Sequence, residues 1–216
     1  MITLSSNQLK IIAAVTMLID HMGLMLFPGH IILRIIGRIS FPIFAFMISE
    51  GCFYTKNKSR YFLRFFSLAL LCQGGYFIFN QSLDMGVLVT FSVAILLIYA
   101  LDKSVLLFVL LIPVVYFLNI YVDIDYGFWG CMVPVFPSLL KNTKYDSLVA
   151  RIFMLTVALA ILSFVLGGVQ LYCLLAVPFL LLYSGKRGKV NMKWFFYIFY
   201  PLHLVVLYII ANGGIL

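Results

Sequence analysis

The amino-acid sequence predicts an all-α fold, a polytopic transmembrane helix bundle of about nine spans. Hydrophobic residues make up 64% of the 216 residues, and charged residues make up only 10%. A soluble domain has about 45–50% apolar and about 25% charged residues. The apolar residues also fall into runs close to the roughly 20 residues that a helix needs to cross a bilayer. We therefore expect a single integral membrane domain, residues 1–216.

Nine apolar segments account for that span count, taken in chain order. The first contains Asp20 and lacks a small-residue cleavage site, so we interpret it as a retained helix and not as a signal peptide. The sixth contains Gly127, Gly130, Pro134 and Pro137, which is typical of a broken or re-entrant segment shielded by protein. The sixth and eighth segments are short for a span. The predicted spans are residues 9–27, 31–54, 61–79, 86–101, 104–121, 127–140, 149–167, 169–184 and 194–212.

Basic residues in the short loops predict the orientation, because Lys and Arg concentrate in cytoplasmic loops. The loops at 80–84, 123–125 and 167–170 have no basic residue, and they alternate with basic loops. This alternation places the N-terminus inside and, after nine spans, the C-terminus outside. The basic loops contain Lys56, Lys58 and Arg60 after the second segment, Lys141 and Lys144 after the sixth, and Lys186 and Arg187 after the eighth.

Five ionisable side chains then fall at a similar depth in the outer half of the bundle. With a rise of 1.5 Å per residue, Asp20 and His21 lie about 10 Å below the outer end of their span. Arg34 and Arg38 lie about 5–12 Å below the outer end of the second span, and His203 about 13 Å below that of the ninth. A charged group at mid-bilayer costs about 2.5–3.5 kcal/mol, so such groups are functional candidates.

His21 is the predicted catalytic base, because imidazole can take up and return a proton near neutral pH. The alternative is a core histidine that hydrogen-bonds to its neighbours. Adjacent helical residues do not face each other, so Asp20 is not expected to bond directly to His21. We expect Asp20 to pair with Arg34 or Arg38 or to orient His203, as a catalytic group or simply as an ion pair that fixes helices together.

Arg34 and Arg38 share one helix face, and either is a counter-charge for Asp20 or a donor to a developing oxyanion. Arg34 is also a predicted substrate- or coenzyme-binding residue. Snorkelling to the outer surface is the alternative, more so for Arg34 than for the deeper Arg38. Pro42 removes the amide that would bond to the Arg38 carbonyl, which predicts a kink. Pro201 frees the carbonyl of Tyr197 in the same way, near His203. His203 is the predicted catalytic partner that supports His21, mainly through substrate affinity, and Tyr200 on the same face is placed to position substrate or carry a proton.

The inner basic loops predict anionic lipid as a partner. They would also suit the phosphates of a cytoplasmic coenzyme, a use that the spacing of the basic residues does not specify. The net charge of +8 is explained by these loops, so nucleic acid is not an expected partner. The four cysteines are scattered, without a CxxC or Cys/His cluster, so no metal site is predicted. Glu50 is expected to pair with the basic cluster near Lys56. The candidate coenzyme-binding residues are Lys56, Lys58, Arg60, Lys186 and Arg187.

Five sequence stretches together resemble the TraX family: MLIDHMG at 17–23, GRISFPIFAFMISEG at 37–51, VTFSVAIL at 89–96, YGFWG at 126–130 and FYIFYPLHLVVL at 196–207. The resemblance extends over nearly the whole chain. It implies an acetyltransferase of the bacterial inner membrane that uses acetyl-CoA as co-substrate, since the family is named for the acetylase of F-type conjugative pilin. Carried over by residue, it supports Asp20, His21, Arg38, Pro42 and His203.

Three functions follow as alternatives. The first is an acetyltransferase that moves an acetyl group from cytoplasmic acetyl-CoA to an amine or hydroxyl of a protein or glycan at the outer face. In it His21 deprotonates the acceptor, or forms an acetyl-histidine intermediate, and Arg38 or a backbone amide stabilises the oxyanion. The second is a proton-coupled transporter or channel that uses the same polar layer. The third is a non-enzymatic factor for pilus or envelope assembly, in which the buried charges only fix the helices.

Overall fold

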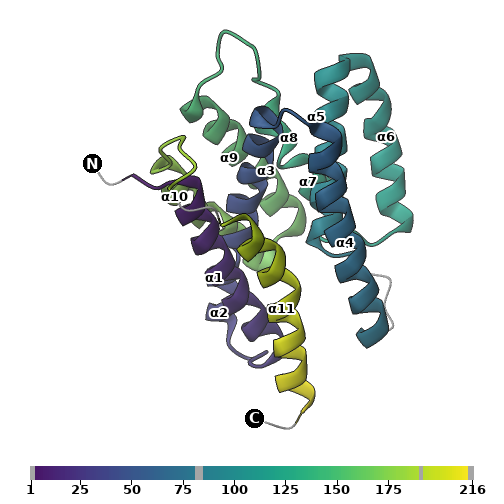
Figure 1. Cartoon of the computed structure of the whole chain (residues 1–216), viewed down its shortest axis with the longest axis vertical. Coiled ribbons are helices and arrows are strands. Elements are labelled where there is room, and N and C mark those ends of the chain that lie inside the picture. Colours follow the sequence, from purple (N-terminus) through teal and green to yellow (C-terminus); the bar gives the residue numbers. More distant parts are fainter. Residues whose placement is uncertain (1–2, 81–84, 190–191, 214–216) are drawn as a thin grey trace. The chain divides into compact units, whose positions relative to one another are not determined.

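A computed structural model describes residues 3–80, 85–189 and 192–213, and this part of the chain is all-helical (Figure 1). It contains no strand, only two isolated bridges, Leu4 with Tyr183 and Met85 with Ile124. The helices are α1 (Ser6–Met25), α2 (Ile31–Gly37), α3 (Ser40–Tyr54), α4 (Lys58–Asn80), α5 (Val87–Lys103), α6 (Val105–Tyr121), α7 (Gly127–Met132), α8 (Val135–Ser138), α9 (Leu148–Leu166), the 3₁₀-helix η1 (Gly168–Ala176), α10 (Val177–Leu181) and α11 (Lys193–Asn212).

The helices coincide with the nine predicted segments, three of which are divided. The second segment is α2 followed by α3, the sixth is α7 followed by α8, and the eighth is η1 followed by α10. Pro42 lies in the first turn of α3, where a missing amide is tolerated but the helix before it cannot continue unchanged. The predicted kink therefore lies at residues 38–39. In the predicted outer loop at 80–84, residues 81–84 lie outside the described residues.

Four helical stretches of the described chain are long and apolar enough to cross a membrane. They are Ser6–Met25, Ile31–Tyr54, Leu148–Leu166 and Phe195–Asn212. The apolar helices Val105–Tyr121 and Gly168–Leu181 are shorter. These lengths are those expected of a membrane protein.

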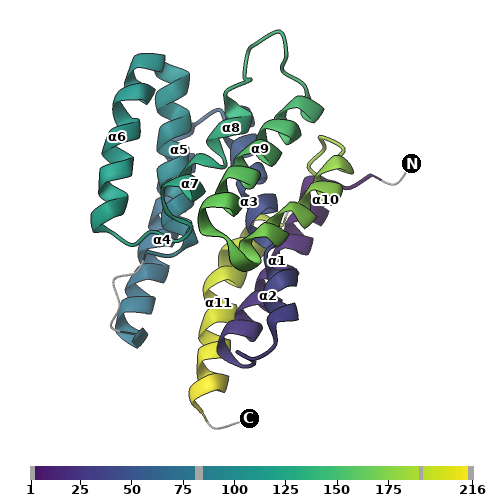
Figure 2. The same ribbon diagram turned by 180° about the vertical axis from the view of Figure 1, so that it is seen from behind.

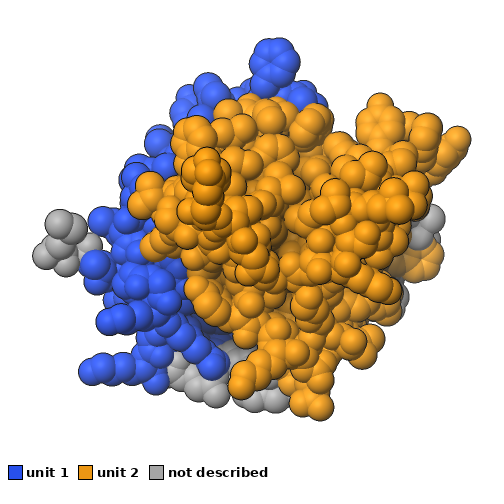
Figure 3. Space-filling model, turned by 90° about the horizontal axis from the view of Figure 1, so that it is seen from above, with its two compact units in different colours: residues 1–44, 163–216 blue, residues 45–162 orange. Residues whose placement is uncertain are grey.

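The chain divides into two compact units, coloured separately in Figure 3. Residues 1–44 and 163–216 form the first unit, and residues 45–162 form the second. The first unit contains α1, α2, η1, α10 and α11, and thus all five ionisable residues of the predicted polar layer. The second contains α4 to α8.

In the first unit, α1 packs against both α2 and α11 (Figures 1 and 2). Glycines bring α1 and α2 into close contact. A β-carbon on Gly23 of α1 would come within 2.7 Å of that of Leu33, and one on Gly37 of α2 would overlap the side chain of Asp20. Small residues let helix backbones approach closely, and here they bring α2 against the acidic residue of α1.

The beginning of α1 is held by its own cap and by the chain after α10. Ser5 and Gln8 form a reciprocal capping box. The amides of Ser6 and Asn7 donate to the carbonyls of Lys186 and Arg187 at 2.8 and 3.2 Å. The N-terminal end of the chain and the loop after the eighth segment are therefore on the same side of this unit, as the predicted topology requires.

In the second unit, α5 lies between α4 and α6 (Figures 1 and 2). Before α5 begins, Met85 exchanges backbone hydrogen bonds with Asp123 and Asp125 at 2.7 and 2.8 Å. At its other end, Asp102 accepts from Lys58 and Lys141 at 2.7 and 2.8 Å. The chain from Asp125 to Lys141 thus runs the length of α5, about 25 Å for 17 residues. The sixth segment is broken, as predicted, but it passes from one end of α5 to the other and is not re-entrant.

Candidate functional site

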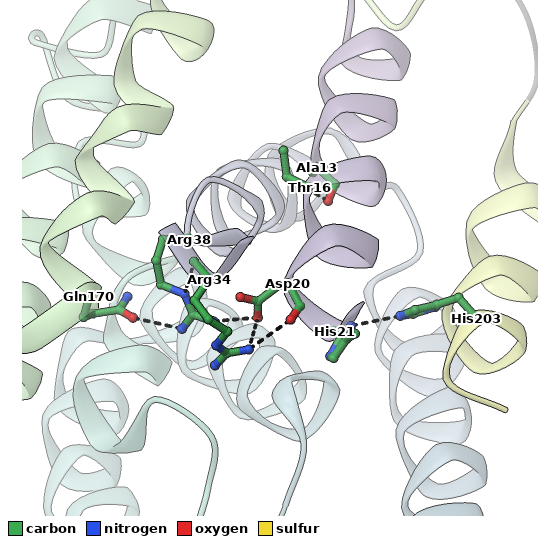
Figure 4. Close-up of polar contacts among 8 residues, drawn as sticks. All are labelled: Ala13, Thr16, Asp20, His21, Arg34, Arg38, Gln170 and His203. Carbon is green, nitrogen blue, oxygen red and sulfur yellow. Dashed lines mark hydrogen bonds and ion pairs between the residues drawn. The ribbon is translucent and has the colours of Figure 1, made fainter. Parts of the chain in front are cut away.

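The centre of the candidate site is a carboxylate shared by two arginines (Figure 4). Asp20 Oδ2 lies 2.6 Å from Arg38 Nη2 and 3.0 Å from Arg34 Nη1. Arg34 Nη1 also donates to the backbone carbonyl of Asp20 at 3.2 Å. Asp20 Oδ1 is buried and has no hydrogen-bond partner among the described residues. The expected pairing of Asp20 with Arg34 or Arg38 is thus made with both.

The two arginines differ in how completely they are engaged. Every nitrogen of the Arg38 guanidinium faces an acceptor: Asp20 through Nη2, Gln170 Oε1 through Nη1 at 3.3 Å, and the Arg34 carbonyl through Nε at 3.4 Å. The Arg38 side chain is 9% exposed, and that of Arg34 is 25% exposed. The deeper position predicted for Arg38 agrees with this difference.

A polar network extends from Arg38 into η1, and sequence reasoning did not find it. Gln170 is buried, and its backbone carbonyl accepts from Ser163 Oγ at 3.2 Å. Ser163 Oγ also lies 3.3 Å from Cys173 Sγ. The signal available in the sequence was a glutamine, Gln170, at the start of an apolar segment. Its partner Arg38 is 132 residues away, so only the tertiary fold connects them.

The second part of the site is a pair of histidines from α1 and α11. His21 Nδ1 lies 3.1 Å from His203 Nε2, and the ring centroids are 5.0 Å apart. His203 Nδ1 lies 2.7 Å from the carbonyl oxygen of Phe199. A carbonyl only accepts, so His203 Nδ1 carries a proton and donates it. In the neutral ring, His203 Nε2 then accepts from His21 Nδ1–H, which leaves the lone pair of His21 on Nε2.

The ring of His203 is fixed by its own helix as well as by His21. It stacks on Phe199 with centroids 4.9 Å apart, and Tyr200 meets it edge to face at 5.8 Å. Tyr200 is thus a neighbour of the histidine, on the face predicted from their spacing. Pro201 lies inside α11 between these residues and His203.

Asp20 and His21 point to different partners, as their adjacent positions on a helix require (Figure 4). Asp20 faces the arginines of α2, and His21 faces His203 of α11. The alternative in which Asp20 orients His203 is wrong, because the groups that hold His203 are His21, Phe199 and Tyr200. His30 is exposed in the loop after α1, as expected of a surface residue.

Three of the predicted coenzyme-binding residues, Lys56, Lys58 and Arg60, are in the second unit and are exposed. Lys58 is tied to Asp102 together with Lys141. Burial acts to raise the pKa of Asp102, but the hydrogen bonds from Lys141 and Lys58 outweigh it and hold the pKa below its usual value. Lys58 is therefore neutralised in part. In the first unit, Lys186 and Arg187 are exposed at the beginning of α1.

The sequence predicted that Glu50 pairs with the basic cluster near Lys56. This prediction is wrong, because Glu50 pairs with Arg151 instead. Its Oε1 lies 2.5 Å from Arg151 Nη1, and Arg151 also approaches Asp146 at 3.3 Å. Next to it in the chain, Ser49 Oγ lies 3.0 Å from Ser138 Oγ of α8. Arg151 lies in α9, about 100 residues after Glu50, and a loop residue only six positions away was the nearest cation in sequence. Among the described residues, no group of three or more His, Cys, Asp or Glu side chains could hold a metal ion.

The family follows from a comparison over almost the whole chain. The family model described as TraX protein matches residues 5–211. This chain belongs to the TraX family. The match includes Asp20, His21, Arg34, Arg38 and His203.

Two curated proteins are similar to this TraX chain. "Probable fimbrial assembly protein FimC, serogroup H1" from Dichelobacter nodosus is 29% identical over 237 aligned residues, which cover 95% of each chain. "Uncharacterized protein RP591" from Rickettsia prowazekii (strain Madrid E) is 35% identical over 97 residues, 45% of this chain and 38% of that protein. No solved structure matches the chain.

Proposed function

We propose that this TraX-family chain is an integral-membrane acetyltransferase that moves an acetyl group from cytoplasmic acetyl-CoA to an amine or hydroxyl acceptor at the outer face. The observation that carries the proposal is the hydrogen-bonded series from the Phe199 carbonyl through His203 to His21. It orients His21 so that an unprotonated Nε2 is available as a base.

In the proposed reaction, His21 Nε2 takes the proton of the acceptor N–H or O–H group as that atom attacks the thioester carbonyl carbon. The tetrahedral oxyanion lies in the positive field of Arg38 and Arg34, whose two charges exceed the one of Asp20. When the intermediate collapses, the C–S bond breaks and the coenzyme A thiolate receives the proton from His21. The acetyl group is then on the acceptor, and His21 is neutral again.

The donor is proposed to bind at basic loops that are predicted to be cytoplasmic. The candidates are the exposed Lys56 and Arg60 in the second unit and, taken separately, the exposed Lys186 and Arg187 in the first. A coenzyme with several phosphates favours such a basic surface, and so does anionic lipid. Asp102 neutralises part of the charge of Lys58, so we assign Lys58 a smaller contribution to binding of the coenzyme phosphates.

The acceptor is proposed to be a pilin-like protein or an envelope glycan. The printed name of the Dichelobacter nodosus relative, a fimbrial assembly protein, supports the first. The same name supports the alternative of a non-enzymatic assembly factor, in which the buried ion pairs only fix the helices. The transporter alternative rests on the buried charges alone.

The test is acetyl transfer by the purified chain in liposomes, with radiolabelled acetyl-CoA and a panel of acceptors that includes water, short peptides with a free N-terminus and simple sugars. We expect transfer by the wild type and a loss of about 10²–10⁴-fold for His21→Ala, the range typical of a general base. His30→Ala is the matched control, because His30 is an exposed loop histidine.

Equal activity of His21→Ala and the wild type would contradict the proposal. Ion flux through the same liposomes, with no transfer to any acceptor, would instead favour the transporter. Absence of both, with loss of fimbriae in cells lacking the chain, would favour the assembly factor.

A further inference from the structure

Arg34 has a donor edge that no described residue accepts from. Both contacts of its guanidinium, to Asp20 Oδ2 and to the Asp20 carbonyl, leave from Nη1. Within the part of the chain that the structure describes, Nη2 and Nε of Arg34 donate to no group. The Arg34 side chain is 25% exposed, whereas that of Arg38 is 9% exposed and each nitrogen of its guanidinium faces an acceptor.

The charge around this edge is also unbalanced. Asp20 is the only Asp or Glu in the sequence of residues 1–44 and 163–216, and it forms ion pairs with both Arg34 and Arg38. The cluster therefore has one positive charge in excess, beside helices that are apolar enough to cross a membrane. A guanidinium with two free N–H directions matches the geometry of a carboxylate or phosphate, which it can bind bidentately.

We propose that Arg34 binds an anionic group, a phosphate or a carboxylate, on the acceptor molecule. This rests on the proposed transferase function and names the chemical class of its acceptor: an amine or hydroxyl compound with an anionic group near the nucleophile. Arg34 Nη1 stays on Asp20 and fixes the guanidinium, while Nε and Nη2 bind the anion. The contact of Arg38 with Asp20 holds the carboxylate in place next to Arg34.

The test is anion binding and does not depend on transfer. The full chain in nanodiscs of phosphatidylcholine is titrated with inorganic phosphate, acetate and O-phosphoethanolamine at constant ionic strength, with ethanolamine as the probe that lacks an anion. We expect Arg34→Gln to weaken binding of the anionic probes by about tenfold or more, the effect of losing a charge-assisted pair. Arg34→Lys keeps the charge and should retain part of the binding.

The matched control is Arg64→Gln, which removes an exposed arginine from α4 and should leave binding unchanged. Thermal unfolding of each variant checks that it is folded. If Arg34→Gln is not folded, Arg34→Lys supplies the comparison, because its single ammonium group lacks the planar fork that binds an anion bidentately. Anion binding that is equal in wild type, Arg34→Gln and Arg34→Lys would overturn the proposal.

A second arm identifies the source of the anion. The same titration in nanodiscs with phosphatidylglycerol loses the soluble phosphate signal if an anionic lipid headgroup occupies Arg34, and keeps it if the ligand is a soluble or protein-borne group. Transfer without Arg34-dependent binding would refute this inference alone. Arg34-dependent binding without transfer would refute the transferase and leave the anion site standing.

Discussion

At the scale of single residues, the site consists of two systems that share α1. Asp20 belongs to an ion cluster with α2, and the next residue, His21, belongs to a histidine pair with α11. The successive residues of a helix point about 100° apart, so one turn of α1 can serve both. The cluster fixes α2 and supplies positive charge, and the histidine pair supplies the proton acceptor.

Arg38→Ala is expected to be more harmful than Arg34→Ala. It removes contacts to Asp20, Gln170 and the Arg34 carbonyl in a buried position, and breaking a buried pair costs about 3–5 kcal/mol. Asp20 would keep its ion pair with Arg34, so we expect the free energy of unfolding to fall by an amount near the lower end of this range. Arg34→Ala should cost about 1 kcal/mol, because its guanidinium is partly exposed and Asp20 keeps Arg38. Unfolding in detergent micelles measures both. Equal effects would contradict this ranking.

Gly37→Ala is expected to destabilise the first unit by about 1–3 kcal/mol, as overpacking does. The added methyl would overlap the carboxylate of Asp20 and push it away from Arg38. Gly29→Ala is the control, because nothing lies within 4 Å of that position. Unfolding of the two variants is compared in the same detergent. If Gly37→Ala were as stable as Gly29→Ala, Asp20 would not lie against Gly37.

At the scale of elements, the helix positions and the pairing of Asp20 with the arginines after it could be predicted, but the other contacts of the site could not. Each apolar run became a helix, and Pro42 indicated the kink between α2 and α3, because these features depend on local sequence alone. The depth argument placed His21 and His203 in one layer. Depth does not say which way a side chain points around its helix, so their direct contact was missed. Gln170 was missed because it was placed in the predicted loop at 167–170, and its partner Arg38 is 132 residues away.

Ser5→Ala is expected to destabilise α1 by about 1 kcal/mol, since its hydroxyl accepts from the Gln8 amide in the capping box. The neighbouring amides of Ser6 and Asn7 keep their carbonyl partners, which limits the loss. Hydrogen exchange of the first turn of α1 is the measurement. Ser59→Ala, at an exposed position of α4, serves as the control. Unchanged exchange in Ser5→Ala would show that the cap is not formed.

At the scale of the whole molecule, the loop contacts agree with one topology. Lys58, Asp102 and Lys141 come from loops after the second, fourth and sixth segments, which are all predicted to be inside. Met85, Asp123 and Asp125 come from loops after the third and fifth, which are both predicted to be outside. No contact of either cluster joins an inner loop to an outer one. The direction of this topology in the membrane rests on the basic loops.

Cysteine labelling of intact cells tests that direction. In a chain whose native cysteines are replaced by alanine, Lys56→Cys should not react with a membrane-impermeant reagent, and Asn212→Cys should react. Both positions are exposed, so burial does not protect either one. Permeabilised cells should label both, which is the control for reactivity. Labelling of Lys56→Cys on intact cells would reverse the orientation and place the polar layer in the inner half.

The central claim is that His21 takes the acceptor proton and that His203 orients it. The sequence predicted that His203 acts on substrate affinity, but its Nε2 lies against His21, so we now expect an effect on kcat. The decisive measurement is kcat and KM for acetyl transfer by wild type, His21→Ala and His203→Ala. We predict a loss in kcat of about 10²–10⁴-fold for His21→Ala and a smaller one for His203→Ala, both with little change in KM. Near wild-type transfer by His21→Ala, with an inactive His203→Ala, would contradict the claim and place the base on α11.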